Sequence, residues 1–226
     1  MSNVRGELAR NRLLDAYRML SSRYHDPKFT ASENAQVERL LDQLAGTIVY
    51  STQHYIERPH QVVRGETLEQ ISRRYKVPPQ LLAKINGLAP GQPLKAGMVL
   101  KVVRGPFTAE IDLARHELTL KLPDGGYAGR FAIGVGRNVP RVEKSYRVYD
   151  KIETPPGPAV TPAAVSSGPL AKQKWIGLEG RLGIHATANP SDVGRSGAGD
   201  GIALRARDVD DLYDILSVGS RVVIRR

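Results

Sequence analysis

The chain of 226 residues contains no cysteine. This absence excludes disulfide bonds, cysteine-ligated zinc and thiol catalysis. There is a single tryptophan, and no apolar run approaches the ~18 residues that a membrane span requires. The first part of the chain also lacks the apolar stretch of ~7–15 residues found in secretion signals. Taken by themselves, these absences predict a chain without a transmembrane segment that stays in the cytoplasm.

The composition that remains is typical of a globular protein. Apolar residues make up 41% and charged residues 25% of the chain, which argues against disorder, and the length suits one to three small domains. The formal net charge of +10 favours anionic partners such as nucleic acid, wall polymers or acidic lipid. The sequence shows no zinc finger, helix-turn-helix or aromatic-interleaved basic motif, so we predict that the protein does not bind nucleic acid.

Residues 1–58 are predicted to form a helical hairpin. Apolar residues between Leu13 and Leu20 follow the spacing of one helix face, and Thr30 with Glu33 forms a capping box ahead of a second apolar stripe. The hairpin is either a tetratricopeptide-like fragment that docks a protein partner or a pair that packs on the following domain. Because one helix pair is too small to bury its own core, we also expect missing N-terminal sequence, which would have carried a secretion signal.

Residues 59–104 are predicted to form a β-α-α-β module. A capping box at Thr67 and Gln70 opens the first helix, and Asn86-Gly87 ends the second. The segment resembles the LysM module. The residues that carry the resemblance are Val63–Leu68, Ile71, Tyr75–Val77, Leu82, Asn86–Leu88, Gly97 and Leu100.

The resemblance implies glycan binding. Modules of this kind bind N-acetylglucosamine-containing glycans, mostly peptidoglycan, in a shallow groove between the loop before the first helix and the loop after the second. By position, it implicates Gly65, Glu66, Thr67, Leu68, Asn86, Gly87 and Leu88. The alternative is structural, because Thr67 caps a helix, Leu68 suits a core, and the two glycines supply unusual backbone angles.

Residues 105–226 are predicted to form a β-rich sandwich or partly open barrel, which makes the whole chain an α+β protein. Strands are expected at 109–113, 118–122, 131–136, 146–152, 175–178, 182–185 and 221–224, with a helix over 208–216 and a proline-rich loop over 154–169. The turn after Leu122 is a strong hairpin signal. Many short strands at close spacing are typical of such folds.

The stretch IHATANPSDVGRSGAGDGIAL at 184–204 resembles the active-site signature of the L,D-transpeptidase family. In that signature a histidine base is followed by a serine, a glycine and the nucleophilic cysteine. His185 matches the base, whereas the nucleophile falls on Gly201, the preceding glycine on Asp200 and the serine on Ala198, with Gly199 between them. The resemblance thus implies a degenerate catalytic site, since glycine cannot form a covalent intermediate.

The sequence supports three functional hypotheses. The first is a peptidoglycan-associated protein that binds wall glycan through the LysM-like module and carries an inactive pseudoenzyme domain of the transpeptidase family. The second is an active acyltransferase with a non-cysteine nucleophile, for which Ser196 is the nearest candidate. The third is a basic interaction protein that docks through its helical hairpin. The partners expected are glycan strands and stem peptides, without cofactor or metal, in the cell envelope or periplasm.

Overall fold

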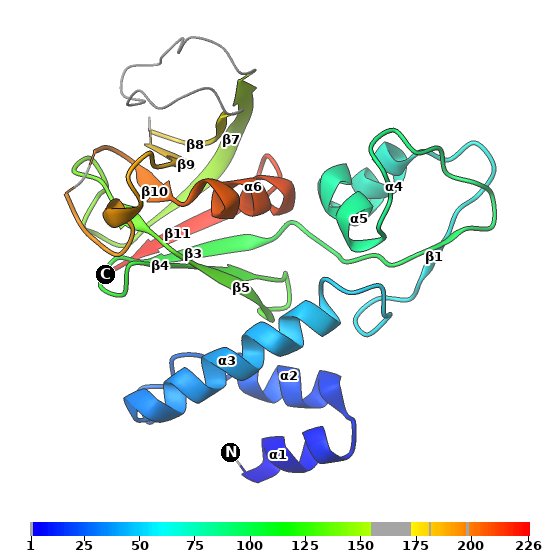
Figure 1. The fold of residues 1–226 in the computed structure, drawn as a ribbon, viewed down its shortest axis with the longest axis horizontal. Coiled ribbons are helices and arrows are strands. Elements are labelled where there is room, and N and C mark those ends of the chain that lie inside the picture. Colours follow the sequence, from blue (N-terminus) through cyan, green and yellow to red (C-terminus); the bar gives the residue numbers. More distant parts are fainter. Residues whose placement is uncertain (1, 155–172, 181, 198) are drawn as a thin grey trace. The chain divides into compact units, whose positions relative to one another are not determined.

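The computed structural model describes residues 2–154, 173–180, 182–197 and 199–226. The chain divides into two compact units: residues up to Gly105 together with Leu120–Gly129, and Pro106–Thr119 together with Arg130–Arg226 (Figure 1). Helices and a large mixed sheet are both present, which confirms the predicted α+β class. Most of the predicted proline-rich loop over 154–169 lies outside the described residues.

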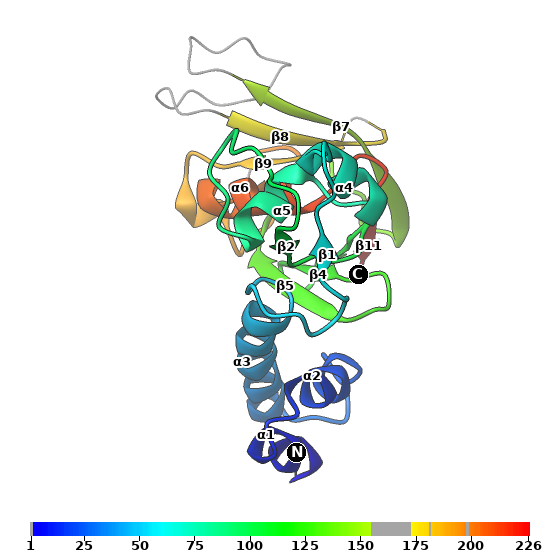
Figure 2. The same cartoon turned by 90° about the vertical axis from the view of Figure 1, so that its right-hand side faces the viewer.

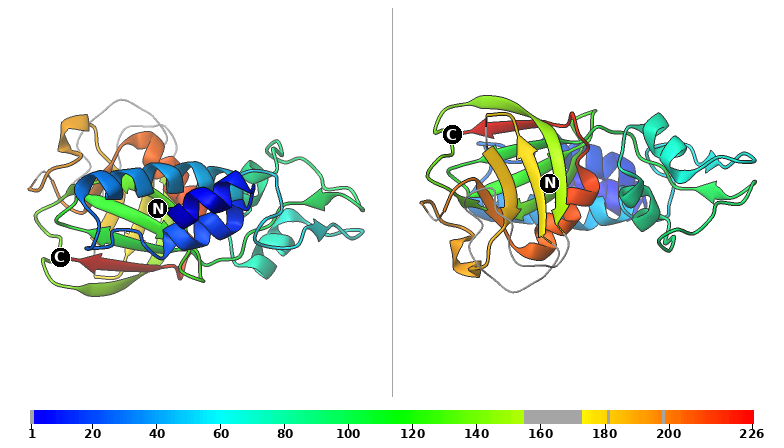
Figure 3. Two further views of the ribbon diagram at one scale, coloured as in Figure 1. Left: turned by 90° about the horizontal axis from the view of Figure 1, so that it is seen from below. Right: turned by 90° about the horizontal axis from the view of Figure 1, so that it is seen from above.

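Three helices open the chain: α1 (Ser2–Ala9), α2 (Leu13–Ser21) and α3 (Ala31–Ile48). Figure 3 shows them lying side by side. The two predicted helices are confirmed, and α3 begins at the expected capping box, where the Thr30 side chain accepts from the Glu33 amide and Glu33 accepts from the Thr30 amide. Helix α1 was not predicted, because its sequence has no capping signal and only a weak apolar face.

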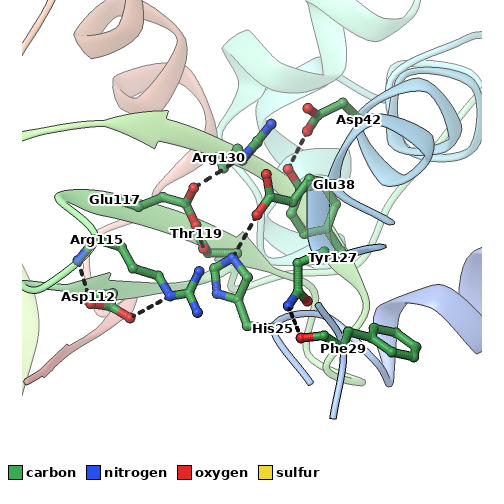
Figure 4. Close-up of polar contacts among 11 residues, drawn as sticks. His25, Phe29, Glu38, Asp42, Asp112, Arg115, Glu117, Thr119, Tyr127 and Arg130 are labelled. Carbon is green, nitrogen blue, oxygen red and sulfur yellow. Dashed lines mark hydrogen bonds and ion pairs between the residues drawn. The ribbon is translucent and has the colours of Figure 1, made fainter. Parts of the chain in front are cut away.

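Helices α2 and α3 pack on the tip of a hairpin formed by β4 (Glu117–Lys121) and β5 (Tyr127–Ala132). The hydroxyl of Tyr17 donates to the Tyr127 carbonyl oxygen at 2.6 Å. The Tyr127 hydroxyl in turn donates to Asp42 on α3 (Figure 4). A Cβ at Gly126 would lie 2.6 Å from the Tyr17 hydroxyl, so glycine permits this close approach. The predicted packing surface was the following domain, residues 59–104, whereas these contacts reach Tyr127, farther along the chain.

The β-α-α-β module consists of β1 (His60–Gln61), α4 (Leu68–Tyr75), α5 (Pro79–Ile85) and β2 (Val99–Leu100), with β1 and β2 antiparallel. Figure 2 shows both helices beside this two-stranded ladder. The element order and the capping box at Thr67 are as predicted. The first strand is short, because the chain turns at Val63–Glu66, where the Glu66 amide donates to the Val63 carbonyl oxygen.

A nine-stranded sheet has the order β5-β4-β3-β11-β7-β8-β9-β10-β6. Its other elements are β3 (Thr108–Asp112), β6 (Gly134–Val135), β7 (Lys144–Thr154), β8 (Gln173–Leu178), β9 (Leu182–Ala186), β10 (Ile202–Leu204) and β11 (Arg221–Arg225), accompanied by a 3-10 turn, Pro190–Asp192, and helix α6 (Ala206–Ile215). The β3–β11 and β9–β10 pairs are parallel, so the sheet is mixed. The expected sandwich-like or barrel-like architecture is confirmed.

One strand prediction is wrong. Residues 131–136 do not form a single strand, because the chain bends at Ile133 and its two halves, β5 and β6, lie at opposite ends of the strand order. The Ile133 amide donates to the His116 carbonyl oxygen, and a Cβ at Gly134 would lie 2.5 Å from the Asp192 carbonyl oxygen. Alternation of side chains alone does not reveal such a bend.

No helix among the residues described above is long and apolar enough to cross a membrane.

Candidate functional site

The strands β7, β8 and β9 have one face against α6 and one face directed away from it. Lys151 on β7 donates to the Leu216 carbonyl oxygen at 2.8 Å, and Lys174 on β8 pairs with Asp210 and Asp214 of α6. Figure 3, seen from above, shows α6 beside these strands. Because side chains alternate along a strand, the residues next to Lys151 and Lys174 point to the other face.

That other face, which we call the site face, carries the predicted catalytic histidine. Trp175 on β8 pairs directly with His185 on β9, and Gly177 pairs with Gly183 one step along. Ala203 on β10 pairs with His185 in parallel register. On β8 and β9 the site face is therefore rich in glycine, and Trp175 and His185 are the large side chains that these two strands place on it.

Gly201, immediately before β10, lies beside the imidazole of His185. A Cβ on Gly201 would come within 3.4 Å of His185 Nε2, which is the placement that a nucleophile beside its base requires. The same Cβ would lie 2.6 Å from the Gly183 carbonyl oxygen, and the φ angle of Gly201 is +76°, in the left-handed region. The backbone here has adopted a conformation that only glycine fits without strain.

The loop that carries Gly201 forms hydrogen bonds with residues 136–138. The Gly201 amide donates to Asn138 Oδ1 at 2.6 Å, the Gly136 amide donates to the Gly201 carbonyl oxygen at 2.8 Å, and the Arg137 amide donates to the Gly199 carbonyl oxygen at 3.0 Å. An amide at the nucleophile position is a natural donor to a developing oxyanion. Here the Gly201 amide already donates to Asn138, so it is not available to an oxyanion.

Both ring nitrogens of His185 contact main-chain carbonyl oxygens. Nε2 lies 2.8 Å from the Asp200 oxygen and Nδ1 lies 3.0 Å from the Ala186 oxygen. A neutral imidazole has one N–H, so only the doubly protonated ring donates to both. A general base needs a free lone pair directed at the proton it removes. In the neutral ring, whichever nitrogen carries the lone pair faces a main-chain carbonyl oxygen and not a proton that it could remove.

The structure thus brings together four of the five residues predicted for the catalytic site: His185, Gly199, Asp200 and Gly201. Ala198 lies outside the described residues. Sequence reasoning missed Asn138, because 63 positions separate it from Gly201 and only the fold makes them neighbours. It also missed Gly136, whose Cβ would lie 2.6 Å from the Gly201 nitrogen.

Ser196, the candidate replacement nucleophile, contacts a different histidine. Its Oγ lies 2.9 Å from His116 Nε2 and 3.4 Å from Arg141 Nη1. The two nitrogens of His185 have the carbonyl partners described above. A Ser196–His185 couple is therefore not formed, whereas a Ser196–His116 couple is.

The residues predicted for glycan binding divide into scaffold and surface. Glu66 accepts from His60 Nε2 at 2.9 Å and from the Val63 amide at 3.1 Å. Asn86 bridges α5 to the end of β2 through the Leu82 and Lys101 carbonyl oxygens and the Lys101 amide. Thr67 caps α4, and Leu68 and Leu88 are half-buried. Gly65 and Gly87 are exposed with φ of +81° and +62°.

The carboxylate of Glu66 is expected to make the first unit less stable at low pH. Its hydrogen bond with His60 lowers the pKa of Glu66, so the stabilisation is present above its ordinary pKa of 4.5 and is lost as pH falls further. We expect the melting temperature of Glu66→Gln to fall less than that of the parent between pH 6 and pH 3.5. Glu69→Gln, with the same charge change on an exposed residue, serves as control, and equal acid sensitivity of parent and Glu66→Gln would contradict the assignment.

Comparison with known proteins identifies two domains in the chain and two relatives of it. Residues 60–103 match the model of the LysM domain, and residues 106–224 match that of the L,D-transpeptidase catalytic domain. The protein named L,D-transpeptidase YkuD of Bacillus licheniformis is 30% identical over 172 residues, covering 73% of this chain and 97% of that one. Its namesake in Bacillus subtilis is 24% identical and covers 74% and 98%.

Among solved structures, an L,D-transpeptidase from Mycobacterium smegmatis matches with 14% identity and a TM-score of 0.42, covering 57% of this chain and 64% of that one. The structure of LdtMt1 in complex with imipenem matches with 13% identity and a TM-score of 0.42, covering 59% and 64%. The chain spans about 64% of the length of these two solved relatives.

Proposed function

Because the chain belongs to the L,D-transpeptidase family, a peptidoglycan-associated family, and carries a LysM domain ahead of its catalytic domain, we propose that it acts by binding the cell wall and not by acyl transfer. In this proposal residues 59–104 hold glycan strands and residues 105–226 form a pseudoenzyme, with the helical hairpin 1–58 as a support. The protein accordingly resides in the cell envelope.

The observation that carries this proposal is the closed polar arrangement around Gly201. An acyl-enzyme needs a nucleophile, a base with a free lone pair, and amide donors for the oxyanion. Gly201 provides no nucleophile, its amide is bonded to Asn138, and both nitrogens of His185 face carbonyl oxygens. All three requirements are unmet by the same few residues.

Sedimentation with purified peptidoglycan sacculi tests the binding half of the proposal. We expect the full chain to pellet with sacculi and to remain bound at 0.3 M salt, about the ionic strength at which purely charge-driven retention of a +10 protein weakens. Leu88→Ser should weaken retention by about fivefold or more, because Leu88 lies in a predicted glycan loop. Leu94→Ser, another half-buried leucine of the module, is the control.

Loss of retention at low salt would remove the proposal. Equal retention of parent and Leu88→Ser would instead move the glycan contact away from the predicted loops.

One observation favours a second candidate, an acyltransferase with a serine nucleophile. Ser196 Oγ and His116 Nε2 are at hydrogen-bond distance, as in a nucleophile–base pair. This candidate requires that a stem-peptide acyl group be transferred to Ser196 with departure of the amine, and that Ser196→Ala abolish the adduct. Intact-mass measurement after incubation with a tetrapeptide donor separates it from the binding proposal.

A further inference from the structure

The single tryptophan of the chain lies flat against two glycines of the site face. An ideal Cβ on Gly177 would come 2.4 Å from Trp175 Cζ3, and one on Gly183 would come 2.3 Å from Trp175 Nε1. Since these glycines belong to β8 and β9, the indole lies across both strands, with its six-membered ring over β8 and its N–H edge over β9. One side of the ring therefore packs directly on backbone.

Open apolar side chains continue this surface onto β7. Tyr149 meets Trp175 edge to face with ring centroids 6.1 Å apart, and Ile152 pairs with Trp175 across the ladder. The side chains of Tyr149 and Ile152 are 53% and 38% exposed. Large apolar groups that stay exposed beside a flat indole are uncommon on a surface without a ligand.

Polar groups stand at both ends of the indole. Asp150 pairs with Gly177 at the β7 end, and His185 pairs with Trp175 at the β9 end. One Asp150 oxygen accepts from the Lys151 amide, and the carboxylate is otherwise exposed. We name Tyr149, Asp150, Ile152, Trp175 and His185 the tryptophan shelf.

We propose that the tryptophan shelf binds a hexopyranose ring of a glycan chain, as a second glycan site beside the LysM domain. The C–H face of a pyranose is apolar and uncharged. It can stack on the flat indole and cover its exposed apolar surface. The hydroxyl groups at the rim of the ring then donate hydrogen bonds to the exposed carboxylate of Asp150, and the imidazole of His185 borders the other end of the stacked ring. The inference rests on the proposed wall-binding function and assigns part of that binding to the degenerate catalytic domain.

The glycines of the site face fit this assignment. A side chain at Gly177 or Gly183 would lift the indole from the sheet, because its Cβ would occupy the position of the ring. The glycines therefore seat Trp175 in the plane of the strands, where its outer face is presented for stacking. A protein that holds glycan at two sites gains retention through the raised effective concentration of the second contact.

The fluorescence of Trp175 reports on this site alone, because the chain has no other tryptophan. We would titrate the full chain with the tetramer of N-acetylglucosamine and, separately, with a free stem tetrapeptide. We expect a saturable change in emission with the glycan, and an apparent dissociation constant at least about fivefold weaker in Tyr149→Ala. Val142→Ala, an exposed apolar residue of the same unit that is 62% exposed, should behave as the parent.

A variant in the LysM domain distinguishes the tryptophan shelf from the proposed wall-binding function. Leu88→Ser should weaken sacculus retention by about fivefold or more, while its Trp175 emission still responds to the tetramer. Unchanged emission at saturating tetramer, with sacculus retention intact, would overturn the shelf and leave the proposed function standing. A response to the tetrapeptide only would also overturn it, since the site would then recognise peptide. A normal emission response in a parent protein that fails to pellet would overturn the proposed function and not the shelf.

Discussion

Gly201→Cys is expected to destabilise the protein and to create no acyl-enzyme. The residue lies at a φ of +76°, which costs a non-glycine residue about 1–2 kcal/mol, and its Cβ would lie 2.6 Å from the Gly183 carbonyl oxygen. Relief of that overlap requires a backbone shift of the kind that costs about 1–3 kcal/mol. We therefore expect a loss of about 2–5 kcal/mol in urea denaturation. We also expect an unchanged mass after incubation with a tetrapeptide donor, because His185 still faces the Asp200 oxygen.

Two alanine variants isolate the crowding from the backbone strain. Gly199 also has a positive φ, +65°, but its Cβ would meet nothing within 4 Å. Gly199→Ala should therefore lose only the strain contribution, about 1 kcal/mol, and Gly201→Ala clearly more. If Gly201→Cys is as stable as Gly199→Ala, or takes up an acyl group, the conformation described here is wrong.

The same geometry indicates what a reactivated variant needs. The family signature that 184–204 resembles also has an arginine two residues after the nucleophile, at the position of Ala203. Restoring the family residues by Ala198→Ser, Asp200→Gly, Gly201→Cys and Ala203→Arg leaves the amide of residue 201 bonded to Asn138. We expect Asn138→Ala to be required in addition, because it releases the donor that an oxyanion would use. Activity in the fourfold variant without the Asn138 change would contradict the role assigned to Asn138.

Lys101→Met is the second variant with a large expected effect. The side chain is fully buried, and Nζ donates to the Ile48 carbonyl oxygen at 2.8 Å and to the Gln53 carbonyl oxygen, which ties the end of α3 to the end of β2. Methionine fills a similar volume but leaves both carbonyl groups without a donor, at about 1–3 kcal/mol for a buried group. Lys95→Met, on an exposed lysine of the same module, should change the free energy of unfolding by less than about 0.5 kcal/mol.

The loss in Lys101→Met should grow with pH. Burial lowers the pKa of Lys101 from its ordinary 10.5 to about 8. Between these values the unfolded chain binds the proton and the folded chain does not, so the parent gains stability as pH rises from 8 to 10.5, by at most about 3 kcal/mol. The neutral amine still has two N–H groups for the two carbonyl oxygens. A difference between parent and Lys101→Met that is equal at pH 7 and pH 10 would contradict this.

The elements of the fold were predictable where local chemistry fixes them. The capping boxes at Thr30 and Thr67 set the starts of α3 and α4, and the period-two alternation around Leu118 and Leu120 set β4. These signals act over a few residues and need no tertiary contact. The short strand β10 escaped prediction, and β6 was predicted only as the end of a longer strand, since their two or three residues pair only because distant segments meet.

The position of the candidate site in the sequence was predictable, but the hydrogen bonds that its residues make were not. The motif located His185 and Gly201, but no local pattern indicates that Asn138 occupies the Gly201 amide or that both nitrogens of His185 meet carbonyl oxygens. Likewise, the sequence shows one tryptophan, and only the strand register shows that it lies over Gly177 and Gly183. Such contacts arise between segments far apart in the chain, where propensity carries no information.

We propose that residues 105–226 perform no acyl transfer, and this proposal can be tested directly. The most direct test is the intact mass of the full-length protein after incubation with a disaccharide-tetrapeptide donor, with release of the terminal D-amino acid followed in the same sample. An active L,D-transpeptidase run in parallel establishes that the donor is competent. We expect the mass of the protein to stay unchanged and no amino acid to be released. A mass increase equal to the transferred acyl group, on Ser196 or on any other residue, would contradict the claim.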